Sequence, residues 1–170
     1  MLAGFVDGRG RKYDLNFRTL RTRMLDEDGT LVVGEGDRVR AQAPCEAEAS
    51  VRLGEKSLAF LLRCPGEVTA TSRRYIFLVG PRAPRPQGQV TLLNVKLPIQ
   101  PTAIASFFAE QGGREYLEFT QDDVVVARET RSGVAVELRG PAPGRADEAV
   151  AYLATFAPAA GVREVFEDLL

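Results

Sequence analysis

The densest group of side chains that could do chemistry is a basic cluster near the start of the chain. Its members are Arg9, Arg11, Lys12, Arg18, Arg21 and Arg23, and within that span only Asp14 carries the opposite charge. Tyr13 and Phe17 interleave with them. Because arginine binds phosphate bidentately and aromatic rings stack on bases, this N-terminal basic cluster is typical of a surface for anionic lipid or nucleic acid. Arginine also discourages exposed strands from pairing with other chains, so a solvated, structural role is the alternative.

A second basic pair, Arg73-Arg74, lies between two predicted strands. We include both residues among the candidates for binding an anionic ligand. Long charged side chains normally stay at the protein surface, so the alternative is a pair that faces solvent where a strand begins.

The rest of the sequence argues against an enzyme. Histidine is absent, which excludes Ser-His-Asp and Cys-His catalysis and histidine-ligated zinc. The acidic groups Asp122-Asp123 and Asp26-Glu27-Asp28 could bind a cation, but both lie in predicted turns, where aspartate is favoured for local hydrogen bonds. We therefore expect no catalytic residue, no metal site and no cofactor.

Cys45 and Cys64 are the only cysteines, too few for a zinc site built from cysteine alone. On neighbouring strands they could form a disulfide, which in an intracellular protein would suggest a hyperthermophile or a redox role. The alternative is two buried thiols that act as small apolar side chains.

The bulk composition fits one globular unit. With 170 residues, 45% of them hydrophobic, the chain can build a sizeable core. Its formal net charge of -1 gives no global attraction to nucleic acid or membrane, so such binding would need a local patch. No apolar run approaches the roughly 20 residues of a membrane span, and Met1 to Asp7 lacks the features of a signal peptide, so we expect a cytoplasmic protein.

Short strands at close spacing with glycine-bearing turns predict a β-barrel or sandwich. The N-terminal part is expected to form two hairpins, followed by a strand that ends before Pro44; the next segment alternates in a way that fits a strand slightly better than a helix. The ranges are Leu2–Val6 with Lys12–Phe17, Leu20–Leu25 with Thr30–Val33, Val39–Ala43, and Glu46–Leu53.

The central stretch is the most informative. Leu58–Leu62 is a short apolar strand that Pro65-Gly66 should stop. Gly66–Arg73 alternates, Ser72-Arg73-Arg74 marks a turn, and the continuously apolar Tyr75–Val79 predicts a strand covered on both sides. After a Pro-rich and Gly-rich loop over Gly80–Gln89, we expect strands at Val90–Leu97, Glu115–Thr120, Val124–Glu129 and Val134–Leu138.

Three helices complete the prediction. A short inserted helix is expected over Thr102–Gln111, and C-terminal helices over Asp147–Phe156 and Gly161–Leu170, where apolar residues recur at helical spacing. The expected fold is a mainly β barrel or sandwich, with the inserted helix and an open end that the C-terminal helices close.

The order of these elements resembles the pleckstrin-homology-like superfamily, especially its GRAM and bacterial branches. The resemblance covers about residues 46–156. It rests on Gly66, Thr71, Ser72, Arg73, Arg74, Ile76 and Phe77, on Tyr116-Leu117-Glu118-Phe119 followed by Asp122-Asp123-Val124, and on Asp147–Phe156 as the closing helix, with Tyr152 or Phe156 as its aromatic residue. It implies a pleckstrin-homology-like unit over residues 44–170, preceded by a hairpin unit or extra strands over residues 1–43.

The resemblance also implies a non-catalytic adaptor that recognises a protein partner through a sheet edge or the groove beside the closing helix. The basic loop with which such domains bind phosphoinositides would lie near Arg52 and Lys56, where Glu55 opposes it. We therefore expect a protein partner. The alternative is a peripheral binder of anionic membrane or nucleic acid through the N-terminal basic cluster.

Overall fold

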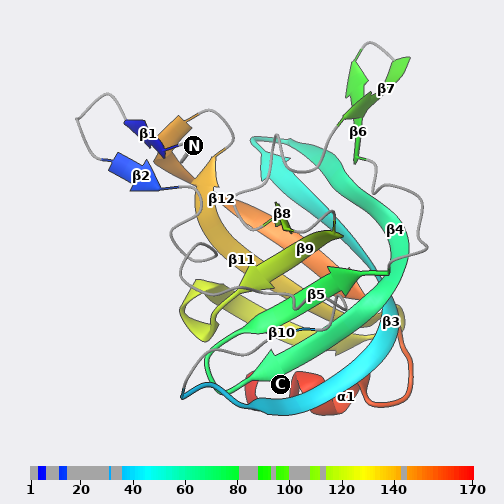
Figure 1. The fold of residues 1–170 in the computed structure, drawn as a ribbon. Coiled ribbons are helices and arrows are strands. Elements are labelled where there is room, and N and C mark those ends of the chain that lie inside the picture. The colour runs from blue at the N-terminus through cyan, green and yellow to red at the C-terminus, as the bar shows by residue number, and fades with distance from the viewer. Residues whose placement is uncertain are drawn as a thin grey trace.

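The computed structural model describes residues 4–6, 12–14, 31, 36–80, 88–92, 95–99, 108–111, 114–142 and 145–170. Within them the chain is almost entirely β-structure, so the prediction of a mainly β protein is confirmed (Figure 1). The strands are β1 (Gly4–Val6), β2 (Lys12–Asp14), β3 (Val39–Leu53), β4 (Lys56–Thr71), β5 (Tyr75–Val79), β6 (Gly88–Leu92), β7 (Val95–Ile99), β8 (Phe108–Gln111), β9 (Arg114–Phe119), β10 (Val124–Thr130), β11 (Gly133–Ala142) and β12 (Arg145–Phe156). The helical segments described are η2 (Gln121–Asp123), α1 (Val162–Val165) and η3 (Glu167–Leu169).

Ten strands form one antiparallel sheet in the order β10-β11-β12-β3-β4-β5-β9-β8, with β6 paired to β4 and β7 to β6. The hairpin of β1 and β2 is separate and confirms the first predicted hairpin; the second lies outside the described residues, apart from Leu31. No described strand joins β10 to β8, so in this part of the chain the sheet is not closed into a barrel.

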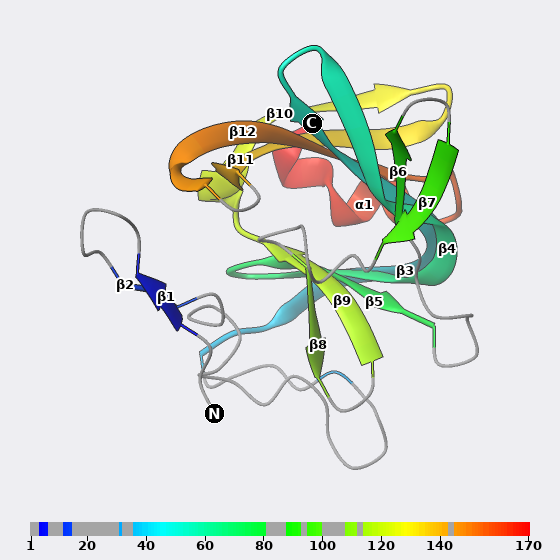
Figure 2. The same cartoon turned by 90° about the horizontal axis from the view of Figure 1, so that it is seen from above.

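The long hairpin of β3 and β4 connects the two halves of the sheet. The Ala47–Val51 part of β3 pairs with β12, whereas the Gly66–Ala70 part of β4 pairs with β5. Register shifts near Ala49 lie within the part that pairs with β12, and irregularities of this kind bend a strand and increase its twist. The two halves therefore face each other, and α1 lies at one end of the space between them (Figures 1 and 2).

Both predicted stops in this hairpin were wrong. Pro44 lies inside β3, where β12 has not yet begun to pair, so the missing N–H breaks no ladder there. Pro65 and Gly66 lie inside β4, and a Cβ on Gly66 would come within 2.4 Å of the Leu78 carbonyl oxygen, so glycine lets β5 approach closely. The boundary after Ala43 falls within β3, which runs through it without a break.

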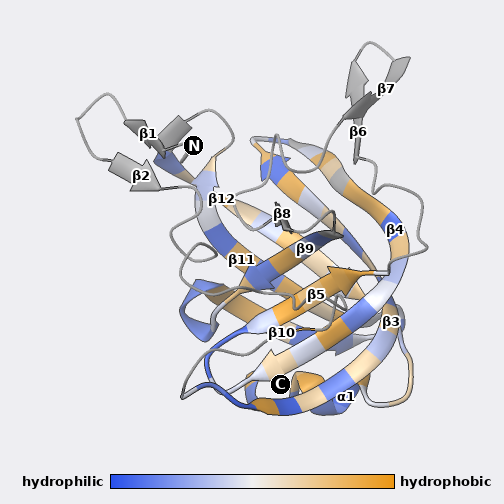
Figure 3. Ribbon diagram, viewed as in Figure 1, coloured by the Kyte–Doolittle hydropathy of each residue, from blue (hydrophilic) through white to orange (hydrophobic). Residues whose placement is uncertain are grey.

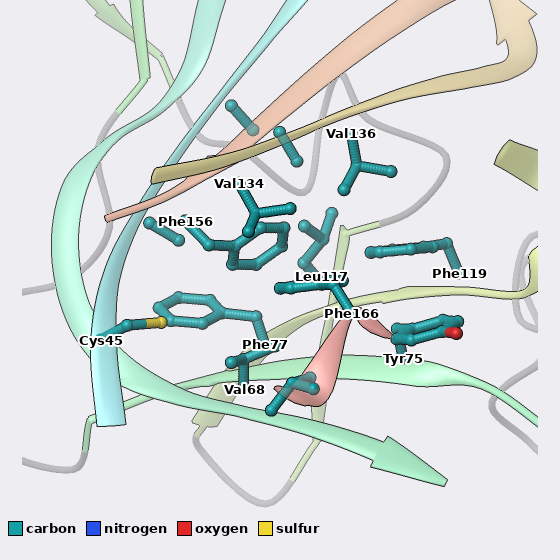
Figure 4. Packing of buried hydrophobic residues seen from close by; sticks show 14 of the residues in the cluster. Cys45, Val68, Tyr75, Phe77, Leu117, Phe119, Val134, Val136, Phe156 and Phe166 are labelled. Atoms are coloured by element: carbon teal, nitrogen blue, oxygen red, sulfur yellow. The ribbon is translucent and has the colours of Figure 1, made fainter. Parts of the chain in front are cut away.

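The core fills the space between the two halves. The Phe77 ring of β5 lies 6.1 Å from that of Phe156 on β12, and Tyr75 stacks on Phe119 of β9 at 5.3 Å. Val134 and Val136 of β11 point into the same cluster (Figure 4).

Strand β5 is buried along its whole length, as predicted. Its residues Tyr75, Phe77 and Val79 belong to the main core, whereas Ile76 and Leu78 pack with Tyr116 in a second, smaller cluster on the opposite face. Figure 3 shows β5 as hydrophobic along most of its length, in contrast to the alternating colours of β3 and β4.

The predicted helix over Asp147–Phe156 was wrong, because this segment belongs to strand β12. Its alanine-rich sequence fits the period of a helix and also that of a strand. Pairing with β11 on one side and β3 on the other provides backbone hydrogen bonds along both edges of this segment, which favours the strand. Tyr152 and Phe156, taken as alternatives for one helical position, both face the core as i and i+4 of the strand.

The predicted inserted helix was wrong over its last four residues, which form β8; residues 102–107 lie outside the described part. The strand predicted over Val90–Leu97 is instead a hairpin of β6 and β7.

The C-terminal segment closes one end of the core with four residues of α-helix and a 3-10 turn. Val162, Val165 and Phe166 are buried, and the Phe166 ring lies 4.7 Å from Phe156 and 5.7 Å from Tyr75. None of the described helices has the length and apolar character needed to cross a membrane.

Candidate functional site

The turn between β4 and β5 carries the predicted pair Arg73-Arg74. The Thr71 hydroxyl oxygen accepts hydrogen bonds from the backbone N–H groups of Arg73 (3.2 Å) and Arg74 (3.1 Å). This turn directs the two side chains into different surroundings: Arg74 is only 8% exposed, whereas Arg73 faces solvent.

Arg74 belongs to a buried ion network that joins three separate segments. Its Nη1 donates to Glu118 of β9 at 2.9 Å, and its Nε lies 3.5 Å from the carboxylate of Asp37, just before β3. The Asp37 carboxylate also accepts hydrogen bonds from the Ser72 hydroxyl (2.8 Å) and the Arg38 N–H (3.0 Å).

Burial by itself raises the pKa of Asp37. The hydrogen bonds from Ser72, Thr71 and the Arg38 backbone, with the charge of Arg74, more than offset this and hold the pKa below its ordinary value of 3.8. Since buried charges persist only when they are paired, the network fixes the start of β3 against the β4–β5 turn and β9. The guanidinium of Arg74 is therefore buried in ion pairs within the protein, and Arg73 is the member of the pair that an anionic ligand could reach.

The N-terminal basic cluster lies outside the described residues. The exception is Lys12, which is described only as a backbone position of β2. Two other exposed arginines, Arg38 and Arg73, make no ion pair within the described part of the chain.

The cysteines lie on the paired strands β3 and β4, with Cys45 opposite Gly66 and Cys64 opposite Ala47. Both thiols are free and buried, so the structure contains no disulfide between them. Burial raises the pKa of Cys45 to about 12 and that of Cys64 to about 11. Because the thiolate is the reactive form, these side chains are unreactive members of the core.

The acidic groups have local structural roles where they are described. The Asp123 carboxylate accepts hydrogen bonds from the N–H (2.8 Å) and hydroxyl (2.9 Å) of Thr120, capping η2, and Asp122 is exposed. Asp26-Glu27-Asp28 lies outside the described residues. Among those described, no group of three or more His, Cys, Asp and Glu side chains could hold a metal ion.

Among the described strands, β10 forms an open edge of the sheet. It pairs with β11 on one side and with no other described strand (Figure 2). The two-residue turn after β10 closes on the pair Thr130 and Gly133, so the alternation of an antiparallel ladder directs the N–H and C=O groups of Ala127 and Glu129 toward the open side. A register shift at its start leaves Val125 outside the pairing with β11, and Val125 is 57% and Val126 40% exposed.

The edge at β10 was not predicted from the sequence, although the strand itself was. The only signal available was the run Val124-Val125-Val126 followed by Arg128, apolar residues in a segment with exposed charge. The opposite end of β10 contacts the C-terminal segment, where Arg163 lies 3.4 Å from Glu129.

The site residues thus fall into separate places: Arg73 with Arg38 at the β4–β5 turn, the buried thiols in the core, and the open edge of β10. Comparison of the chain with protein-family models, with curated proteins and with solved structures found no match.

Proposed function

We propose that this chain is a non-catalytic, pleckstrin-homology-like binding module that recognises a protein partner by accepting an extended segment as an additional strand on β10. The observation that carries the proposal is the open edge, where backbone groups of Ala127 and Glu129 point away from β11 beside the exposed Val125 and Val126. Such an edge is a template for another strand, because backbone hydrogen bonds supply affinity and side chains on alternate positions supply specificity.

The test removes one edge hydrogen bond without touching the β10–β11 ladder. Proline in place of Ala127 eliminates an N–H that points away from β11, a position where an edge strand tolerates proline. Serine at the same position keeps the N–H and is the matched control. Thermal unfolding of both variants establishes that the fold is retained.

The readout combines capture and hydrogen exchange. A partner recovered from native lysate by the parent and by Ala127→Ser, but not by Ala127→Pro, should slow exchange of the Ala127 and Glu129 amides when it is added back. Equal recovery by all three proteins, or no added protection on β10, would contradict binding at this edge.

The second candidate function is binding of anionic membrane or nucleic acid. It is supported by Arg38 and Arg73, which are exposed and make no ion pair with any residue that the structure describes, in addition to the N-terminal basic cluster of the sequence. Co-sedimentation with anionic and neutral liposomes at low and physiological salt tests the membrane form, since screening should weaken it steeply. If the double variant Arg38→Ser, Arg73→Ser binds anionic vesicles as strongly as the parent protein, these two arginines have no role in membrane binding.

A further inference from the structure

We infer that the open edge of β10 selects a segment that carries an acidic side chain two positions away from an apolar, β-branched one. The inference rests on the proposed function, because it specifies the chemistry of the strand that β10 would accept.

The acidic preference comes from Arg128. Ala127 and Glu129 lie opposite the core residues Val136 and Val134, so Arg128, between them, lies on the outward face of the sheet. It is exposed and makes no ion pair within the described residues. A residue directly opposite on an added strand would have its Cβ about 4.5–5.5 Å away, where opposite charges attract and like charges repel.

The apolar preference comes from Val126, two positions earlier on the same face. Its 40% exposure leaves apolar surface beside the edge, and the bulged Val125 next to it is more exposed still. β-branched side chains pair favourably across strands. Since residues two apart share a face in any strand, the spacing between the apolar and the acidic residue holds for parallel and antiparallel addition.

The other charges around β10 do not reverse this preference. Glu137 lies on β11, opposite Val126, and is therefore two strand spacings, about 10 Å, from an added strand, near the screening length at physiological salt. Glu129 lies on the opposite face and pairs with Arg163. Arg131, in the turn that follows, is exposed and has the same sign as Arg128.

The experiment uses two labelled peptides with capped ends, read by fluorescence anisotropy. The acidic probe is Thr-Val-Thr-Glu-Thr-Val-Thr, which presents the pattern in either direction, and its partner has Lys in place of Glu. The parent protein should bind the acidic probe about two- to thirty-fold more tightly, the range expected when one cross-strand attraction replaces one repulsion. The Arg128→Glu protein should prefer the lysine probe, and the preference should shrink in high salt.

The outcomes separate the two proposals. Equal affinity for the two probes, with binding to both lost in Ala127→Pro, would overturn the acidic preference and leave strand addition standing. Binding that Ala127→Pro does not weaken, or no binding of either probe, would overturn strand addition and the inference with it. An unchanged preference in Arg128→Glu would also overturn the assignment of selectivity to Arg128.

Discussion

Replacing Arg74 by methionine should destabilise the protein far more than the same change at its neighbour Arg73. Methionine keeps much of the volume but removes the charge, so the buried carboxylates of Asp37 and Glu118, with side chains only 4% and 6% exposed, lose their interaction with the Arg74 guanidinium. Removing one partner of a buried ion pair costs about 3–5 kcal/mol. For a chain of this length that corresponds to a fall in Tm of about 6–20 °C.

Arg73→Met is the matched control. Because Arg73 is exposed and makes no ion pair in the described part of the chain, its replacement should change the free energy of unfolding by no more than about 0.5 kcal/mol. Urea unfolding monitored by circular dichroism measures both. Adding Asp37→Asn and Glu118→Gln to Arg74→Met should recover part of the lost free energy of unfolding, since it removes the two buried carboxylate charges that Arg74 pairs with.

The pH dependence provides a further check. The pKa of Asp37 lies below its ordinary value of 3.8, so its contribution to stability is present above that pH and is lost as pH falls through the lower, folded-state pKa. The stability difference between the parent and Arg74→Met should therefore narrow below pH 3.8. Equal unfolding midpoints for Arg73→Met and Arg74→Met at neutral pH would refute the assignment of the network.

Three further outcomes are expected. Gly133→Ala should cost more free energy of unfolding than Gly54→Ala. Both glycines have positive φ, 114° and 63°, but a Cβ on Gly133 would also come within 1.8 Å of the Phe156 carbonyl oxygen, whereas a Cβ on Gly54 meets no atom within 4 Å. Chemical denaturation compares the two variants, and equal costs would contradict the close approach at Gly133. Phe166→Ala should cost about 3–5 kcal/mol, with Leu170→Ala as the exposed control. As the pH rises above 9.0, the free energy of unfolding should fall by up to about 1.4 kcal/mol per pH unit for each buried thiol, because the thiols ionise in the unfolded chain and stay protonated in the folded protein. The double variant Cys45→Ala, Cys64→Ala should show a smaller dependence of the free energy of unfolding on pH in this range.

Local pattern was sufficient where one strand carries an unambiguous signal. The apolar run Tyr75–Val79 predicted a strand buried on both faces, and the turn at Ser72-Arg73-Arg74 and the strand over Val124–Glu129 were predicted close to their observed positions. These features depend on side-chain periodicity and turn chemistry, which are properties of a few consecutive residues.

Pattern failed where distant segments decide the outcome. Asp147–Phe156 has both helical and strand spacing, and its pairing with β3, about a hundred residues earlier, selects the strand. Pro44 and Pro65 are compatible with strands because the neighbouring strand on one side does not pair at either position. Strand β12 pairs with β3 only from Ala47 onward, and β5 pairs with β4 only from Gly66 onward.

The sequence alone was sufficient to predict a mainly β fold, to exclude catalysis by histidine, and to identify the arginines and cysteines that were candidates for binding or for a disulfide. Tertiary structure alone decided that Arg74 is buried while Arg73 is exposed, that both thiols lie in the core, and that β10 is an edge among the strands that the structure describes. The physical reason is that burial, ion pairing and strand neighbours are relations between segments far apart in the chain, and Asp37 and Glu118 surround Arg74 only after the sheet has folded.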